Sequence, residues 1–227
     1  MQKQVVVVGL GRFGVSVATT LHSIGHDVLA IDRDETRIQN ISAQLTHAIQ
    51  ADATNEAVLK ELEIKNFDVG IVAMGSDIES SVLSTILLKK LGVRRVIARA
   101  NDELHGSILE KIGADSVVYP EREMGERVAH RVTLSDVSDY MSIIGRYGMI
   151  QLDAPPTFIG QTLATLGFGP KGKWEIGVLL ILRKKEVIVN PALEEVVEAN
   201  DTLVLAGNDD KIEKLLNETK KTQEQNG

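Results

Sequence analysis

The segment VVVVGLGRFG at residues 5–14 has the residue types and the spacing of a phosphate-binding turn. Gly9, Gly11 and Gly14 follow the GxGxxG pattern between an apolar run and a segment with helical periodicity, the context that a dinucleotide-binding turn requires. The first glycine allows the tight bend, the second lets the backbone approach a phosphate, and the third lets helix and strand pack closely. The free N–H groups at the helix N-terminus favour an anion. The alternative is a glycine turn that holds no ligand.

An acidic residue follows the second apolar run, where a nucleotide-binding fold needs one. A carboxylate at this position, here Asp32, accepts the hydroxyls of an adenosine ribose and repels a 2′-phosphate, which disfavours NADP. Arg33 could stack on the adenine face, and a solvated arginine explains it equally well. Asp34 is better placed than Asp32 to cap the next helix.

Three further segments follow later strands, at the sheet edge where such folds bind ligands. DAT at residues 52–54 could face the adenine edge. MGSD at residues 74–77 contains Gly75, which again indicates a backbone close to a ligand. Arg99 ends the fifth strand, where its charge could reach the phosphates; a surface cation is the alternative.

The sequence contains no recognisable catalytic constellation. Its histidines show no pairing or metal-ligand spacing, and His22 and His26 straddle Gly25 at a helix end. Ser76 lacks the following glycine of a nucleophile elbow, and no GxxxxGK[ST] motif occurs. A dehydrogenase would also need a substrate domain and an acid or base beside the nicotinamide. The pattern therefore favours nucleotide binding without chemistry.

Alternating apolar runs and helical periodicities must position these residues. They predict six strands and a Rossmann-like doubly wound parallel sheet with the order 3-2-1-4-5-6. The predicted strands are residues 5–8, 27–31, 47–50, 69–73, 95–98 and 116–118.

Details of two helices in this region can also be predicted. The first helix should place Phe13, Val17, Leu21 and Ile24 on one face and end at Gly25. Thr54 is a plausible N-cap for the third helix.

A helix is predicted at residues 121–132, after the sixth strand, and it does not lead into a seventh parallel strand. Met124, Val128 and Val132 share one face of it, so it either mediates dimerisation or crossover or packs back on its own sheet.

A different pattern begins after residue 135. Polar residues 133–139 are the expected hinge, and strands are predicted at 149–152, 175–181, 187–189 and 202–205. Short helices are expected at 160–166 and 209–216. The resulting domains are a Rossmann domain at 1–135, a small α+β lobe at 136–217, and a polar tail at 218–227 that frays.

Composition restricts the class of protein further. The chain has 227 residues, no cysteine, 4% aromatic residues and a formal charge of −7. These values exclude disulfides and thiolate metal sites and argue against a nucleic-acid partner. No apolar run reaches the roughly 18 residues of a membrane span, and no basic and apolar leader precedes the first strand. We therefore expect a cytoplasmic protein, one that could still dock on the basic cytoplasmic face of a membrane protein.

Long stretches of the sequence resemble the RCK/KTN proteins, and most of all the TrkA/KtrA-type regulatory subunits of Trk/Ktr potassium uptake systems. The similar segments include VVVVGLGRFGVSVATTL, VLAIDRDETRI, QADATNEAVLKEL, IVAMGSDIESSVLSTILLKKLGV and the tail lobe FIGQTLATL…DTLVLAG. The resemblance covers residues 4–217, and ARANDELHGSILEKIGAD followed by PEREMG is far more specific than the glycine motif.

The resemblance implies a function. In that family the first lobe binds ATP, ADP or NAD(H), the second responds to a ligand that is cyclic di-AMP in some relatives, and no reaction is catalysed. Protomers dimerise and form an octameric ring under a membrane potassium channel subunit. The family commonly has a glycine-aspartate turn before the last strand; here the turn contains Asn200, which tolerates the left-handed conformation.

The resemblance also assigns residues. Arg12 and Arg99 match positions that meet the terminal phosphates of ATP, and Glu121 matches an acid that helps hold a divalent cation such as Mg²⁺ across the dimer; by itself Glu121 is a first-turn helix acid. The predicted nucleotide-binding residues are Gly9, Gly11, Arg12, Phe13, Gly14, Asp32, Arg33, Asp52, Ala53, Met74, Gly75, Ser76, Arg99 and Glu121.

The predicted function is that of a cytoplasmic, nucleotide-sensing gating subunit at the inner face of the membrane, with ATP/ADP favoured over NAD(H). The alternative is an NAD-dependent oxidoreductase, because the glycine turn and Asp32 suit that function equally well.

Overall fold

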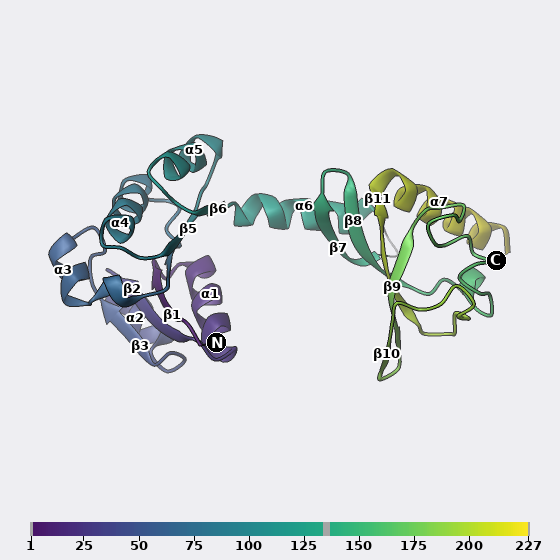
Figure 1. Ribbon diagram of the computed structural model, residues 1–227, viewed down its shortest axis with the longest axis horizontal. Helices are drawn as coiled ribbons and strands as arrows, with labels where there is room; N and C mark the ends of the chain where they lie inside the picture. Colours follow the sequence, from purple (N-terminus) through teal and green to yellow (C-terminus); the bar gives the residue numbers. More distant parts are fainter. Residues whose placement is uncertain (1, 134–136, 227) are drawn as a thin grey trace. The chain divides into compact units, whose positions relative to one another are not determined.

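The computed structural model describes residues 2–133 and 137–226 of the chain. The chain divides into two compact units, Met1–Arg122 and Glu123–Gly227. Helix α6 (Pro120–Thr133) begins in the first unit and continues into the second (Figure 1). Each unit has its own sheet and its own buried core.

The first unit contains a six-stranded parallel sheet with the order β3-β2-β1-β4-β5-β6 (Figure 1). This is the predicted doubly wound arrangement, so the predicted fold class is confirmed. The strands are β1 (Gln4–Val8), β2 (Asp27–Asp32), β3 (His47–Gln50), β4 (Val69–Val72), β5 (Arg95–Arg99) and β6 (Ser116–Val118). The helices are α1 (Arg12–Ser23), α2 (Glu35–Ile41), α3 (Glu56–Glu61), α4 (Ile78–Lys90) and α5 (Glu103–Lys111), with a 3-10 turn η1 (Ile64–Asn66).

The valine run of β1 contributes to the core on both faces of this sheet. Val5 and Val7 lie in a buried cluster with side chains of α1 and α2. Val6 and Val8 lie in a second cluster with side chains of α3, α4 and α5. Because successive side chains of a strand point to opposite faces, one short apolar run positions β1 in the middle of the unit and its carboxyl end beneath the glycine turn.

Two local predictions in the first unit were wrong. Ile24 does not share the buried face of α1 but is 63% exposed, because the helix ends before it and Gly25 turns the chain with a φ of +89°. Asn55, and not Thr54, caps α3 by accepting the N–H of Ala57. The helix therefore begins one residue later than an N-cap at Thr54 would require.

Helix α6 carries an apolar stripe that stays exposed in the single chain. Met124, Val128 and Val132 are 54%, 50% and 77% exposed. Packing on the sheet of the first unit and a role in dimerisation or crossover both remain predictions for this face.

The second unit is a five-stranded antiparallel sheet with the order β10-β9-β11-β8-β7. Helix α7 packs the buried side chains Ile212, Leu215 and Leu216 into the same core as β8, β9 and β11. The elements are β7 (Val137–Ile144), β8 (Tyr147–Asp153), η2 (Pro156–Phe158), β9 (Gly177–Arg183), β10 (Glu186–Val189), β11 (Thr202–Asn208) and α7 (Asp209–Asn226). A small α+β lobe is thus confirmed.

Three predictions for the second unit were incorrect. Part of the expected hinge at residues 133–139 belongs to β7, an edge strand that pairs only with β8 and carries several polar residues; residues 134–136 lie outside the described residues. Residues 160–166 form turns instead of a helix, with Thr162 bridged to Val196. Helix α7 continues through the predicted fraying tail, and Thr219 is still buried on it.

The turn before β11 has the predicted conformation. Asn200 has a φ of +67°, which asparagine tolerates better than most residues. The departure from a glycine at this turn is therefore compatible with the fold.

Candidate functional site

A cavity of about 320 Å³ lies at the carboxyl ends of the first unit's central strands, within the range of small-molecule sites. It is lined by the loops after β1, β3 and β4 and by the ends of β2 and β5. Ten of the predicted binding residues line it: Gly9, Gly11, Asp32, Arg33, Asp52, Ala53, Met74, Gly75, Ser76 and Arg99.

Four predicted residues do not line this cavity. Arg12 is exposed at the first position of α1, while Phe13 packs against the buried cluster beneath it. Gly14 is buried against the glycine turn, and Glu121 contacts Arg99 from outside the cavity wall.

The structure explains the glycine at each of the three positions of the turn differently. Gly9 has a φ of +92°, and a Cβ there would lie 2.5 Å from Cγ of Met74. A Cβ on Gly14 would lie 1.9 Å from the carbonyl oxygen of Gly9. Gly11 has an ordinary φ of −70° and no heavy atom within 4 Å of its Cβ position. Gly9 and Gly14 are thus required by the fold, whereas the described part of the chain gives no reason for glycine at Gly11 except space in the cavity.

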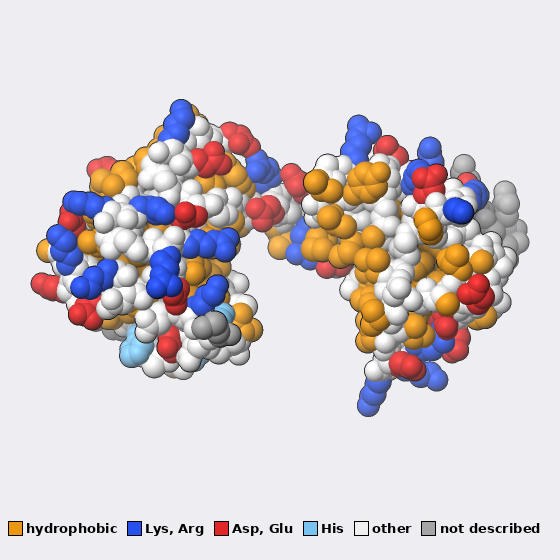
Figure 2. Space-filling model, viewed as in Figure 1, with side chains coloured by type: hydrophobic (Ala, Val, Ile, Leu, Met, Phe, Trp, Pro, Cys, Tyr) orange, Lys and Arg blue, Asp and Glu red, His pale blue; other side chains and the backbone are white. Residues whose placement is uncertain are grey.

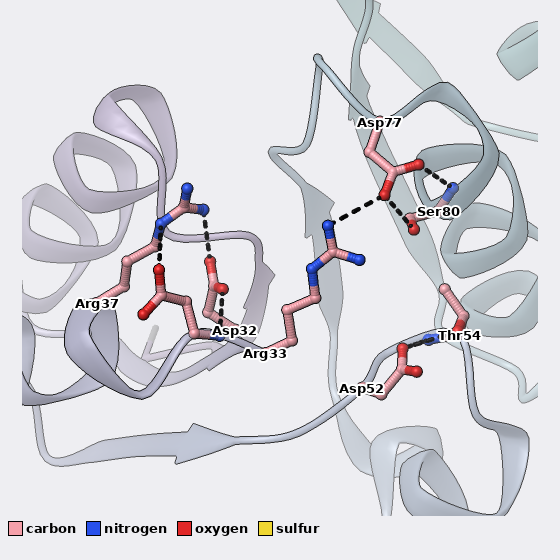
Figure 3. Close-up of polar contacts among 8 residues, drawn as sticks. Asp32, Arg33, Arg37, Asp52, Thr54, Asp77 and Ser80 are labelled. Carbon is pink, nitrogen blue, oxygen red and sulfur yellow. Dashed lines mark hydrogen bonds and ion pairs between the residues drawn. The ribbon is translucent and has the colours of Figure 1, made fainter.

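Asp32 is held at the cavity wall by three donors, of which Figure 3 shows Arg37. The N–H groups of Leu10 and Asp34 donate to its two carboxylate oxygens at 2.6 Å and 2.9 Å. Arg37 donates from Nη1 at 3.2 Å. The side chain of Asp32 is only 4% exposed, so these contacts stabilise a carboxylate that would otherwise be costly to bury.

Sequence reasoning missed Arg37. The residue lies on α2, its side chain is half exposed, and its Nε lies 3.5 Å from Asp34. The prediction that Asp34 caps α2 is confirmed, because its side chain accepts the N–H of Thr36. Helix α2 starts at Glu35, close to the end of β2, so Arg37 in its first turn lies near Asp32, and that spacing could have identified Arg37.

Arg33 extends across the end of β1. It starts at the end of β2 and reaches Asp77 at the start of α4, with Nη2 3.4 Å from Oδ2 (Figure 3). Strands β2 and β4 flank β1 in the sheet, so this ion pair spans the carboxyl end of β1. Asp77 also caps α4 through the N–H and hydroxyl of Ser80, and these hydrogen bonds lower the pKa of its carboxyl.

The loop after β3 is held by hydrogen bonds within the loop and by one hydrogen bond from α4. The hydroxyl and N–H of Thr54 donate to Asp52 at 2.7 Å and 2.9 Å and lower the pKa of that carboxyl. The hydroxyl of Ser84, on α4, donates to the carbonyl of Ala53 at 3.2 Å. Ser80 and Ser84 also line the cavity and were not predicted, because a serine on a helix carries no distinguishing sequence signal.

Arg99 does not use all of its hydrogen-bond donors within the described residues. Its Nη2 donates to Glu121 at 2.6 Å, while its buried Nε has no hydrogen-bond partner among the described residues. A Cβ on Gly75 would lie 2.7 Å from Cζ of Arg99, so the glycine is needed for the guanidinium to lie against the loop. The result is a cation with unused donors in a cavity wall, an arrangement suited to an anion.

Two negative findings apply to the described residues. Within residues 2–133 and 137–226, no group of three or more histidine or acidic side chains is placed to hold a metal ion. Over the same residues, no helix combines the length and apolar character needed to cross a membrane.

Two domain families match the sequence. Residues 5–120 match the TrkA-N domain and residues 149–220 match the TrkA-C domain. Ktr system potassium uptake protein C of Bacillus subtilis (strain 168) is 39% identical over 207 residues, which cover 91% of this chain and 93% of that protein. Ktr system potassium uptake protein A of the same strain is 35% identical over 216 residues, covering 95% of this chain and 96% of that protein.

The fold also resembles that of GsuK. Its RCK domain matches with a TM-score of 0.61 and 17% identity, over 93% of this chain and 46% of that chain. The GsuK channel bound to NAD matches with a TM-score of 0.50 and 22% identity, over 96% of this chain and 38% of that chain. At this identity the likeness shows the fold.

Proposed function

The chain belongs to the family of proteins with TrkA-N and TrkA-C domains, and we propose that it is a nucleotide-sensing regulatory subunit of a potassium uptake system. Its similarity to the two Ktr proteins extends over nearly their whole length. The observation that carries the nucleotide part of the proposal is the empty space at the Cβ position of Gly11, beside a glycine turn that the fold explains at its other two glycines.

The cavity residues fit an adenine nucleotide. The N–H groups at the start of α1 and the unused donors of Arg99 would hold phosphates. Asp32 would accept a ribose hydroxyl, because a carboxylate offers about four acceptor positions and three donors occupy three of them. Arg33 and the loop at Asp52 and Ala53 would contact the base.

ATP and ADP are the preferred ligands in this proposal, with NAD(H) as the second choice. Asp32 suits either adenosine, and a neighbour in fold, GsuK, has been solved with NAD. Arg99 favours a ligand with concentrated phosphate charge, because its cationic side chain lines the cavity and pairs with one largely exposed carboxylate. Glu121, 68% exposed in its side chain, would supply an oxygen ligand to Mg²⁺ or another divalent cation together with ATP.

The regulatory mechanism requires two protein conformations that differ in affinity for the nucleotide. Arg12 is exposed at the turn, and we propose that it contacts a third phosphate that ADP lacks. A nucleotide shifts the equilibrium only if it binds one conformation more tightly than the other, so the contact that ATP makes and ADP lacks would have to form in only one conformation. The shift would then alter the potassium-transporting membrane partner, to which the protein would be bound at the inner face of the membrane.

Assembly completes the proposal. The exposed stripe of α6 is a candidate surface for a homodimer, and the family resemblance extends this to an octameric ring. A second apolar area lies on the edge hairpin of the second unit, where Met141, Ile143 and Tyr147 are about half exposed (Figure 2). Hydrophobic surface of this kind marks interaction sites.

The direct test is a titration of the protein with ATP, ADP, NAD⁺ and NADH, with and without Mg²⁺, measured by calorimetry. We expect Gly11→Val to raise the Kd about 10- to 100-fold, matching the roughly 1–3 kcal/mol cost of overfilling a site. Because no atom lies within 4 Å of that Cβ position, thermal stability should not fall. Gly125→Ala, another glycine with open space, is the matched control. Unchanged binding by Gly11→Val would rule out this cavity as the site.

A second experiment addresses discrimination between ATP and ADP. We expect Arg12→Ala to keep adenosine binding and to lose about a tenfold preference for ATP, the effect of one charge-assisted contact. Small-angle scattering of the wild-type assembly should give different dimensions with the two nucleotides. Identical dimensions would contradict nucleotide-controlled gating.

The alternative function is an NAD-dependent oxidoreductase, which the glycine turn and Asp32 would serve equally well. The described residues that line the cavity include no histidine, lysine or tyrosine to act as acid or base. Sustained hydride transfer from NADH to a small carbonyl compound would favour this alternative over the regulatory one.

A further inference from the structure

His105 is a buried histidine for which the sequence provides no role. It lies on α5 and is 1% exposed. Its Nδ1 accepts the backbone N–H of Asn101 at 3.4 Å, and its backbone N–H donates to Oδ1 of Asp102, the N-cap of α5, at 2.8 Å. The imidazole thus contributes one hydrogen bond to the turn between β5 and α5, the bond to Asn101.

Asn101 connects this turn to the cavity wall. Its side-chain amide donates to the carbonyl of Gly75. A Cβ on Gly75 would lie 2.4 Å from Oδ1 of Asn101 and 2.7 Å from Cζ of Arg99. Asn101 and Arg99 therefore both lie against Gly75, and Gly75 and Arg99 both line the cavity.

The hydrogen bond specifies one protonation state of the imidazole. Because Asn101 donates, Nδ1 must present a lone pair, so the single proton of the neutral ring is on Nε2. Protonation of Nδ1 would direct two N–H groups at each other. Burial lowers the pKa of His105; the negative charge of Asp102 opposes this effect and the positive charge of Arg99 adds to it.

We propose that His105 is a positioning residue for the Gly75–Arg99 wall of the nucleotide cavity, and that it holds this wall through Asn101 only while Nδ1 is unprotonated. This proposal rests on the proposed function, because the wall is taken to bind nucleotide phosphates. It predicts that acidification weakens nucleotide binding through an internal hydrogen bond, without titrating any group that contacts the ligand.

The test compares His105→Asn and His105→Leu with the wild type between pH 5 and 8. Asparagine offers an acceptor near the position of Nδ1 that cannot titrate, whereas leucine offers none. Two quantities are measured: the hydrogen-exchange protection of the Asn101 and Gly75 amides in protein without nucleotide, and the Kd for ATP. His22→Asn, an exposed histidine on α1, is the control for other titrating histidines.

For the wild type and His22→Asn, we expect protection and affinity to fall together on acidification. The drop in affinity should be about tenfold, the effect of one buried hydrogen bond. His105→Asn should keep its protection across the range and lose less affinity than the wild type, because only the terminal phosphate of ATP then titrates. His105→Leu should show low protection and about tenfold weaker binding already at pH 8.

Three outcomes separate the two proposals. Equal pH profiles of amide protection for His105→Asn and the wild type would overturn the role of His105. Wild-type affinity in a folded His105→Leu variant would do the same and leave the proposed function intact. If ATP binds nowhere in the range but protection follows the expected pattern, the positioning role stands and the nucleotide function fails.

Discussion

Arg99 in the first unit and Arg183 in the second each lie at the end of a strand and pair with carboxylates, but the two arginines differ in how their donors are used. Arg183, on β9, donates from Nε and Nη2 to Asp201, from Nη1 to Glu195, and from Nη2 to a backbone carbonyl. Arg99, on β5, donates from Nη2 to Glu121, and its Nε has no partner among the described residues.

The two arginines also differ in their surroundings: Arg183 pairs with a fully buried carboxylate, whereas Arg99 lies beside a cavity. Asp201 has no exposed side-chain surface and also accepts the N–H of Glu198, so the Arg183 cluster ties the segment before β11 to the sheet. Arg99 lines a cavity. An arginine with satisfied donors stabilises the fold, whereas a buried donor without a partner is a cost that a ligand can remove. This contrast supports the proposal that Arg183 stabilises the fold and that Arg99 contacts the ligand.

The largest expected effect is on the structural cluster. Arg183→Met should lower the free energy of unfolding by about 3 kcal/mol, because it leaves the buried carboxylate of Asp201 without its cation. Chemical denaturation measures this change. Adding Asp201→Asn should recover part of the loss, since asparagine can still accept the N–H of Glu198. An Arg183→Met protein as stable as the wild type would contradict the structural role of Arg183.

The same cluster predicts a pH dependence with a definite sign. Burial alone would raise the pKa of Asp201, but the hydrogen bonds and charge of Arg183 lower it below its ordinary value. A carboxyl with a lowered pKa contributes stability above its unfolded-state pKa and loses it as the pH falls through the folded-state pKa. In wild-type protein this contribution should therefore disappear only in strongly acidic solution, and Arg183→Met should show less of this acid dependence.

The binding arginine should give the opposite result. Arg99→Met is expected to change the free energy of unfolding by less than about 1 kcal/mol, because its partner Glu121 is largely exposed. The same variant should weaken ATP binding about 10- to 100-fold through the loss of charge-assisted hydrogen bonds. Calorimetry and denaturation on one preparation measure both. A large loss of stability with unchanged affinity would reverse the assigned roles.

The smallest effect is expected from the Arg33–Asp77 ion pair, because both side chains are partly solvated. Asp77→Asn keeps an N-cap for α4 and releases Arg33, so ATP should bind up to about fivefold more tightly, within the 1 kcal/mol typical of exposed pairs. Arg33→Gln breaks the same pair but removes a cation, so it should weaken binding by a similar factor. Both effects should shrink at high salt. Changes of the same sign in the two variants would exclude competition between Asp77 and the ligand for Arg33.

Most of the first unit could be predicted from sequence because its signals are local. The valine run, the glycine spacing and the breaks after each helix are read within a few residues, and the strand order then follows from the chirality of the connections. The predicted residues at strand ends converge on one cavity for the same reason. Errors occurred at helix ends, where one residue decides the cap, as with Ile24 and Thr54.

The second unit was harder to predict because its pairing is not local. Strand β7 carries polar residues and pairs only along one edge, so its alternation was hidden. The turns at residues 160–166 are held by backbone hydrogen bonds to residues near 195, which no local pattern reports. Helix α7 is longer than its polar composition suggested because Ile212, Leu215 and Thr219 find a buried face to pack on.

The sequence by itself determined the two-part organisation, the parallel order of the first sheet, and the glycine turn with an acid at the end of the second strand. These features depend on spacing and on steric rules that act over short stretches of chain. Only the tertiary structure decided which charged groups are satisfied. Contacts between separate elements produce the hydrogen bond from Arg37 to Asp32 and the one from Asn101 to Gly75. They also produce the contrast between Arg183 and Arg99. The energy of a buried donor is set by those neighbours, and the neighbours exist only after the chain has folded.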